Sequence, residues 1–131
     1  FKRSCGPTMT AVLADLDNLK RLNDNYGHDE GDVAIRAVAQ ALMNSCPEDS
    51  VCVRFGGDEM FAVIKGRAND EIRVKINERL SDFYAKSGKP YTVSASVGIY
   101  TTDSDDATFE ELVRKSDQLM YNEKIAKKIK R

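Results

Sequence analysis

The chain has 131 residues, of which 41% are hydrophobic and 31% charged, and its net charge is −1. This length predicts one domain with one core, and the near-neutral charge argues against nucleic acid as a partner, because backbone binding needs a clear basic excess. The longest apolar runs are far shorter than the roughly 18 residues that cross a bilayer, so we expect no membrane contact by this domain.

The three cysteines, Cys5, Cys46 and Cys52, form no C-x-x-C pair. An odd count argues against a disulfide framework, and the spacing argues against a thiolate zinc site. Free thiols are typical of a reducing compartment, which predicts a cytoplasmic location. A parent protein can still be anchored to a membrane by segments outside this chain.

The first predicted element is a short buried strand, Thr10–Ala14, which ends at Asp15. Residues 31–45 are predicted to form a helix that ends before Pro47, because apolar residues recur at i, i+3, i+4 and i+7. These residues are Ile35, Val38, Ala39 and Leu42. His28, the only histidine, precedes this helix, and its expected role is to hold local structure.

Two short apolar stretches, Val51–Phe55 and Met60–Ile64, flank the sequence Gly-Gly-Asp-Glu and predict a β-hairpin. Asn69 is the predicted N-cap of the next helix. The buried face of that helix is expected to carry Ile72, Ile76, Leu80 and Phe83.

A strand is predicted from Tyr91 to Tyr100, after a break at Gly88 and Pro90. Thr108 and Glu111 have the spacing of a capping box at the start of the last helix. One side of this helix is expected to carry Phe109, Leu112, Val113, Ser116, Leu119 and Met120.

The order strand, helix, hairpin, helix, strand, helix predicts an α+β fold with an antiparallel sheet covered by helices. If the first helical segment crosses over the sheet, the first strand lies beside the hairpin. Asp15 would then lie near the hairpin turn.

Acidic and amide side chains gather after the first strand, between Asp15 and Asp32. A purely structural interpretation remains open for them, since Asp17 can cap a helix turn and Asn25 and Gly27 can shape a loop. The hairpin turn favours a functional interpretation, because it supplies a second acidic cluster. Carboxylates about 4 Å apart repel each other by roughly 4 kcal/mol at an effective dielectric constant near 20, so such a cluster is best stabilised by a cation.

Carboxylate and carbonyl oxygens suit hard ions such as Mg²⁺. The glycines of the turn, Gly56 and Gly57, would let a phosphate or ribose approach the backbone closely. Together these features indicate metal-assisted phosphoryl chemistry.

The runs Asp15–Asp32 and Arg54–Met60 resemble the two signature stretches of GGDEF domains, in the same order and at a similar distance. The resemblance continues through Ser94–Ile99 and Asp117–Lys124 and so covers nearly the whole chain. It implies a ferredoxin-like antiparallel sheet flanked by helices, related to polymerase palms and nucleotide cyclases. It also implies one GGDEF domain over residues 1–131.

The resemblance implies a diguanylate cyclase, an enzyme that condenses two GTP molecules into cyclic di-GMP and two pyrophosphates. Each domain would hold one GTP, so turnover would need a homodimer, and the parent chain would carry regulatory domains. One alternative is a catalytically silent domain that senses GTP, and another is a domain that only dimerises.

By the same resemblance, two Mg²⁺ or Mn²⁺ ions would be held by Asp15, the carbonyl of Leu16, Asp58 and Glu59. Asp58 or Glu59 would also help to deprotonate the attacking hydroxyl, and the sequence does not choose between them. The expected substrate-binding residues are Asn18, Leu19, Asn23, Asp32, Gly56, Gly57, Lys124 and Lys128.

Three parts of that set have a physical reason. A carboxylate at Asp32 can accept from both the N1–H and the N2–H₂ of guanine, with Asn23 beside it. The amides of Asn18 and Leu19, at a helix start, can bind phosphates. Lys124 and Lys128 lie one helical turn apart and can also bind phosphates. For Lys128, a solvated basic tail is the alternative, because Lys127, Lys130 and Arg131 surround it.

The chain departs from the family pattern at four places. Leu19 and Met60 replace bulky aromatic residues, and we expect only packing to change. Only Phe1–Thr8 precede the first predicted strand, so we expect the chain to lack the usual N-terminal motif and helix of the family. The segment 47–50 lacks the Arg-x-x-Asp pattern of a product-inhibition site, so no such site is expected.

Overall fold

A four-stranded antiparallel sheet organises the computed structural model. The structure describes residues 8–104 and 106–129, so the expected N-terminal truncation concerns residues outside the described part. The elements are β1 (Met9–Leu16), α1 (Leu19–Tyr26), α2 (His28–Ser45), β2 (Val51–Phe55), β3 (Glu59–Lys65), α3 (Glu71–Ser87), β4 (Ala95–Thr102) and α4 (Phe109–Ile129).

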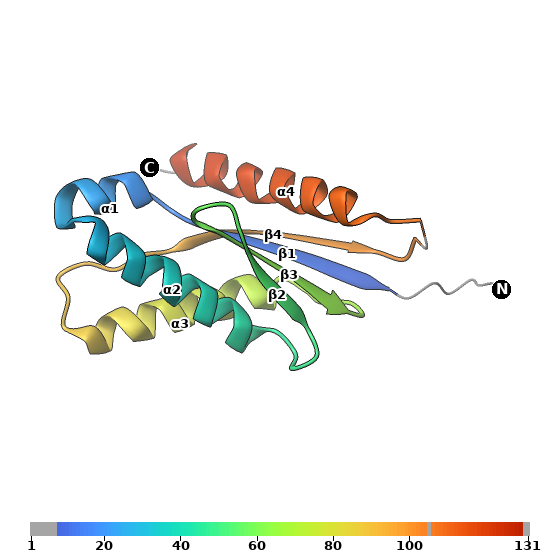
Figure 1. Ribbon diagram of the computed structural model, residues 1–131, viewed down its shortest axis with the longest axis horizontal. Coiled ribbons are helices and arrows are strands. Elements are labelled where there is room, and N and C mark those ends of the chain that lie inside the picture. Colours follow the sequence, from blue (N-terminus) through green and yellow to red (C-terminus); the bar gives the residue numbers. More distant parts are fainter. Residues whose placement is uncertain (1–7, 105, 130–131) are drawn as a thin grey trace.

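Strand β1 lies in the middle of the sheet, between β3 and β4. Helices α1 and α2 carry the chain from the end of β1 to the outer strand β2, so β3 returns beside β1 (Figure 1). In this register Asp15 lies opposite Glu59 on one side and Ser96 on the other. The predicted fold class and the predicted placement of Asp15 near the hairpin turn are therefore confirmed.

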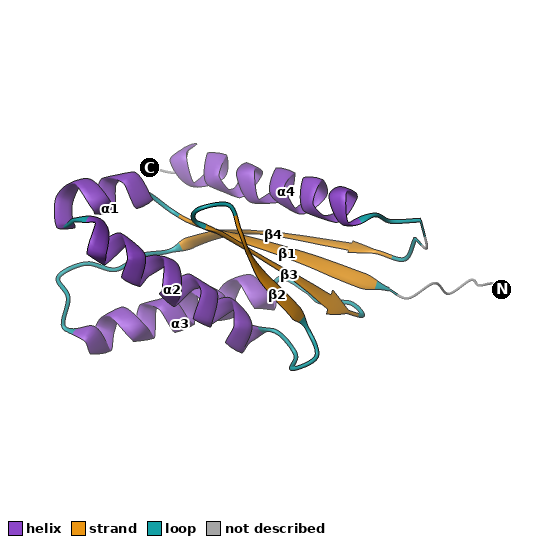
Figure 2. Cartoon of the chain, in the orientation of Figure 1, coloured by secondary structure: helices purple, strands orange, loops and turns teal. Residues whose placement is uncertain are grey.

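The helices cover both faces of the sheet: α4 lies over one face, and α2 and α3 lie over the other (Figure 2). The larger core forms between the sheet and α2 and α3, and includes Val12, Val38, Ile64, Ile76 and Leu80. The smaller core lies under α4 and consists of Ala11, Leu13, Phe61, Leu112 and Met120. Alternating residues of β1 enter the two cores, as expected for a central strand buried on both faces.

Helix α4 packs directly against the backbone of β4 at Gly98. A Cβ atom at this position would collide with the main-chain oxygen of Ser116 in α4. The absence of a side chain therefore permits the close approach of helix and strand, and fixes the height of α4 above the sheet. This packing brings the C-terminal half of α4 to the end of β1.

The predicted cap at Thr108 is present, whereas the N-cap position of α3 is Asp70 and the predicted cap residue, Asn69, bonds to the helix from the position before it. The main-chain N–H of Glu111 donates to Thr108 Oγ1 over 3.0 Å, and that of Glu71 donates to Asn69 Oδ1 over 2.9 Å. Helix α2 begins at His28, three residues before the predicted start, and α1 precedes it. None of the described helices is long and apolar enough to cross a membrane.

Three expectations about burial and strand limits are wrong. Tyr84, which is 2% exposed, takes the buried position predicted for Phe83, which is 43% exposed. Phe109 and Leu119 of α4 are exposed as well, because α4 contacts the sheet along a narrower stripe. The strand predicted from Tyr91 begins only at Ala95. Tyr91 instead packs against the ring of Tyr26, with ring centroids 4.3 Å apart, and its hydroxyl bonds to Glu30.

Candidate active site

Asp15 and Glu59 form the acidic centre of the site. They are cross-strand partners at the ends of β1 and β3, so their side chains leave the same face of the sheet. The side chain of Asp15 is only 13% exposed, and its Oδ1 is a buried oxygen with no hydrogen-bond partner among the described residues. A buried, unpartnered carboxylate oxygen is costly, and a bound cation would remove that cost.

The pKa values of Asp15 and Glu59 are both raised, mainly by burial. Burial is the main cause that raises the pKa of Asp15 to about 7, and the charges of Asp58 and Glu59 add to it, although Lys124 acts in the opposite direction. Burial also raises the pKa of Glu59, followed by the charges of Asp117 and Asp58. Burial and mutual repulsion therefore oppose the ionised form of both acids, and a bound metal ion would favour it.

The hairpin turn that carries Asp58 is braced by Arg54. The Nε and Nη2 atoms of Arg54 donate to the carbonyl oxygen of Gly57 over 3.1 and 2.6 Å. Gly56 has φ +74°, a left-handed conformation that favours glycine. The turn thus exposes backbone at Gly56 and Gly57, and it brings Asp58 close enough to Asp15 for its charge to raise the pKa of Asp15.

Lys124 of α4 reaches into this centre. Its Nζ donates to the carbonyl oxygen of Leu16 over 3.0 Å and lies 3.4 Å from an oxygen of Asp15. The predicted metal-binding atoms of β1 therefore have a lysine ammonium beside them.

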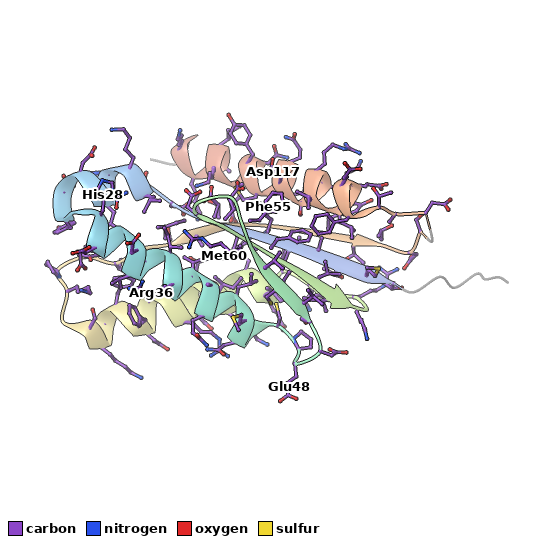
Figure 3. The ribbon with its side chains drawn as sticks, in the orientation of Figure 1. His28, Arg36, Glu48, Phe55, Met60 and Asp117 are labelled. Atoms are coloured by element: carbon purple, nitrogen blue, oxygen red, sulfur yellow. The ribbon has the colours of Figure 1, made fainter. Side chains whose placement is uncertain are left out.

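A small cavity of about 260 Å³ lies next to this lysine, lined by Asp17, Asn18, Ser94, Lys124, Lys127 and Lys128. Asn18 has φ +59°, and Leu19 begins α1 directly after it. The cavity combines three lysines with the start of a helix, which suits an anion with several charges. A larger cavity of about 530 Å³ between α2 and α3, near Arg36 (Figure 3), contains none of the predicted residues.

The predicted base-reading residues lie at the junction of α1 and α2. Asn23 is half-buried, with its side-chain oxygen against Gly31, where any larger residue would collide with it. Asp32 follows Gly31 on the exposed side of α2. The Oδ1 of Asn23 is buried against Gly31 and has no hydrogen-bond partner within the described chain, so the side chain must turn before this oxygen can meet a ligand.

The residues present fit divalent metal ions only in part. Asp15, with its unpartnered oxygen, and the carbonyl of Leu16 offer the hard oxygen donors that Mg²⁺ prefers. Within residues 8–104 and 106–129, however, no three acidic, histidine or cysteine side chains already converge on one metal-sized position. Joint ligation by Asp15, Asp58 and Glu59 therefore requires side-chain rearrangement at the hairpin tip.

The sequence did not identify two residues at this site. Asp17 is 11% exposed and accepts hydrogen bonds from Ser94, Ser96 and Lys127, and Lys127 was considered only as part of a basic tail. Burial opposes the ionised form of Asp17, but the hydrogen bonds outweigh it and lower its pKa below the ordinary value. No spacing signal links Asp17 to Lys127, because 110 positions separate them.

Two other positions considered in the sequence lie away from the acidic centre of the site. His28 is exposed at the first turn of α2, and Glu48 is exposed in the turn between α2 and β2 (Figure 3). The substitutions Leu19 and Met60 both pack against the larger core, which supports the expectation that they alter packing.

Comparisons with known proteins identify the family to which the chain belongs. A family model described as diguanylate cyclase, GGDEF domain, matches residues 3–130. The probable diguanylate cyclase DgcJ of Escherichia coli K12 is 32% identical over 116 residues, which cover 88% of this chain and 23% of that protein. The diguanylate cyclase VdcA of Vibrio cholerae serotype O1 is 33% identical over 128 residues, which cover 91% of this chain and 37% of that protein.

The fold is also shared with a solved structure. The crystal structure of the diguanylate cyclase SiaD in complex with its activator SiaC from Pseudomonas aeruginosa matches with a TM-score of 0.78 at 24% identity. This match covers 91% of this chain and 47% of that one. The chain spans less than half the length of each of these three relatives, and the family model spans nearly all of the chain. The protein is a member of the diguanylate cyclase GGDEF domain family.

Proposed function

We propose that this domain is a diguanylate cyclase that condenses two GTP molecules into cyclic di-GMP and two pyrophosphates. The observation that carries the proposal is the pairing of Asp15 with Glu59 across adjacent strands, beside the Leu16 carbonyl and the lysine cavity. Acidic oxygens and phosphate-binding cations thus lie side by side, as metal-assisted nucleotidyl transfer requires.

The reaction consists of two transfers, each of which forms one P–O bond and breaks another. The 3′-hydroxyl oxygen of one GTP attacks the α-phosphorus of the other, and pyrophosphate leaves with the electrons of the broken bond. The hydroxyl proton passes to a nearby carboxylate, for which Asp58 and Glu59 are the candidates. Burial raises the pKa of Glu59, which suits a group that must accept a proton.

The metal ions would be held by Asp15, the carbonyl of Leu16, Asp58 and Glu59. When bound, Mg²⁺ or Mn²⁺ would offset negative charge on the phosphates and make the attacking hydroxyl more acidic. The family resemblance predicts two ions per site.

The substrate would be held at three places along the site. Lys124 and Lys128 of α4, with the amides of Asn18 and Leu19, would bind the phosphates in the lysine cavity. The open backbone at Gly56 and Gly57 would accommodate the sugar and α-phosphate. Asn23 and Asp32 would read guanine, because a carboxylate can pair with its two neighbouring donors, whereas adenine presents an acceptor there.

One such site holds one GTP, so the working unit would be a homodimer with two sites facing each other. The GTP of each protomer would supply an attacking 3′-hydroxyl and also the α-phosphate that the other GTP attacks. The regulation of this encounter would come from other domains of the parent protein.

Isothermal titration with GTP in the presence of Mg²⁺ tests the binding part of the proposal. Saturable binding of about one GTP per domain, with much weaker binding of ATP, is the expected result. If no heat of binding appears at millimolar GTP, the domain is an interaction module rather than a GTP-binding one. Binding of GTP without any product would instead identify a silent sensory domain.

A further inference from the structure

Asp17 is the most heavily hydrogen-bonded acid at the site. Its two carboxylate oxygens accept from Ser94 Oγ at 2.7 Å, Ser96 Oγ at 2.6 Å and Lys127 Nζ at 2.6 Å, and Lys124 Nζ lies 3.4 Å away. Its lone pairs are therefore largely used within the chain. Asp17 thus differs from Asp15, whose Oδ1 has no partner among the described residues. The role of Asp17 is to hold neighbouring groups in place.

What Asp17 anchors is the turn between β1 and α1. Its main-chain N–H donates to the carbonyl oxygen of Ser94 over 2.9 Å. The next residue, Asn18, is the one non-glycine position with positive φ in the described part of the chain. A strained turn of this kind persists only where its surroundings hold it. The turn also presents the Leu16 carbonyl and the Asn18 and Leu19 amides, which the proposed function assigns to metal and phosphate.

The two lysines near Asp17 contact different atoms. Lys124 bonds to the carbonyl of Leu16 and lies beside Asp15, which are the predicted metal-binding atoms. Lys127 instead donates to Asp17 and, over 3.0 Å, to the carbonyl oxygen of Ala95. Lys127 therefore ties α4, β4 and the turn together without touching a predicted ligand atom.

Resting on the proposed function, we infer that Lys127 is a positioning residue: by holding Asp17, it fixes the turn that binds the triphosphate. Metal and phosphate can then draw Lys124 away from its oxygens while Asp17 remains paired. A residue of a solvated basic tail would lack these contacts, whereas the Lys127 side chain is only 39% exposed and makes both.

The test compares Lys127→Met with Lys127→Arg and with Lys128→Met, its neighbour in the same cavity. Two quantities are measured for each: the amide ¹H–¹⁵N shifts of Asn18 and Leu19, and the dissociation constants of GTP with Mg²⁺ and of guanosine. Loss of an orienting partner typically weakens ligand binding about 10- to 100-fold. We expect Lys127→Met to shift both amide resonances and to weaken the binding of GTP by that factor, while the affinity for guanosine stays nearly unchanged. Lys127→Arg should largely restore the affinity for GTP. Lys128→Met should weaken GTP without moving the amides.

If Lys127→Met leaves the amide shifts of Asn18 and Leu19 and the affinity for GTP unchanged, the inference is overturned. An equal loss for GTP and guanosine, together with a lower melting temperature, would also overturn it, since it would indicate a general structural role. If Lys127→Met does not fold, Lys127→Gln gives the same two measurements with a neutral donor retained. If the wild-type domain binds no GTP, the proposed function fails, and the amide shifts alone then decide whether Lys127 positions the turn.

Discussion

The ammonium of Lys124 lies 3.0 Å from the main-chain carbonyl oxygen of Leu16, although 108 positions separate the two residues. The contact depends on the crossing of α4 over the sheet and on its close packing at Gly98. A positive charge from the last helix is thereby placed on the oxygens at the end of the first strand.

This contact predicts that Lys124 and a divalent metal compete for the same oxygens. In the absence of nucleotide, Lys124→Met should bind Mg²⁺ or Mn²⁺ several-fold more tightly than wild type, because one positive charge no longer opposes the ion. The same variant should bind GTP more weakly, since a phosphate partner is lost. Calorimetric titration measures both affinities, with Lys115→Met, an exposed position on the same helix, as the control. Metal affinity that falls in Lys124→Met would show that this lysine does not oppose the ion.

The acids at the strand ends should be needed for turnover and not for folding. Asp15→Ala and Glu59→Ala are each expected to lower the magnesium-dependent rate by about 100-fold or more, a typical loss when a group that stabilises transition-state charge is removed. Glu48→Ala, in the exposed turn before β2, serves as the matched control and should keep the wild-type rate. Circular dichroism and melting confirm the fold. Retention of a substantial rate by either acid variant would mean that the metal site is assigned wrongly.

The contribution of Asp15 to the stability of the domain in EDTA should fall as the pH rises from 4 to 7. The pKa of Asp15 in the folded chain is about 7, above its ordinary 3.8, so between these values the folded state binds more protons than the unfolded state. The contribution of the neutral carboxyl is present at low pH and is lost as pH rises through 7. Urea unfolding at pH 5 and pH 8 measures this difference.

The stability of Asp15→Asn should fall less across the same pH range than that of the wild type. A part of the fall should remain in this variant, because the pKa of Glu59 is also raised. Asp49→Asn, in the exposed turn, controls for the loss of a charge. Equal pH dependence in wild type and Asp15→Asn would contradict the assigned burial of this acid.

Asp32 should set the choice of base. A site built to hydrogen-bond a substrate can reject an analogue that lacks those groups by about 10⁴-fold, so the wild-type domain is expected to use GTP and not ATP. Asp32→Asn should lose most of this preference through a lower affinity for GTP, while Asp29→Asn, one helical turn earlier on α2, should keep it. Competition between the two nucleotides at equal concentration gives the ratio directly. Comparable consumption of ATP and GTP by wild type would exclude the role of Asp32.

Much of this arrangement could be predicted from local patterns. The apolar run that stops at Asp15 and the Gly-Gly-Asp-Glu turn have short-range signals, and the helix between them requires a crossover that brings the two together. The cap residues Thr108 and Asn69 act on their own helices, so their roles are also local.

The features that escaped prediction depend on distant partners. Tyr91 and Val93 alternate as in a strand, but Tyr91 packs on Tyr26 and bonds to Glu30, so the segment leaves the sheet. The aromatic pair Phe83 and Tyr84 fits a helical face in either register, and only packing against α2 and Tyr91 places Tyr84 inside. Lys127 carries no periodic signal, and its role depends on the path of α4 over β4.

The most direct measurement is the product formed from GTP and Mg²⁺ at increasing protein concentration, separated by ion-exchange chromatography and identified by mass. The account predicts cyclic di-GMP and pyrophosphate in a ratio of about 1:2, at a rate that rises with the square of protein concentration while the dimer is the minor species. A longer chain that includes more of the parent protein should form the product at lower concentration. If GTP remains intact with both proteins, or is hydrolysed without cyclic di-GMP at a rate that is linear in protein, the domain does not have the proposed activity.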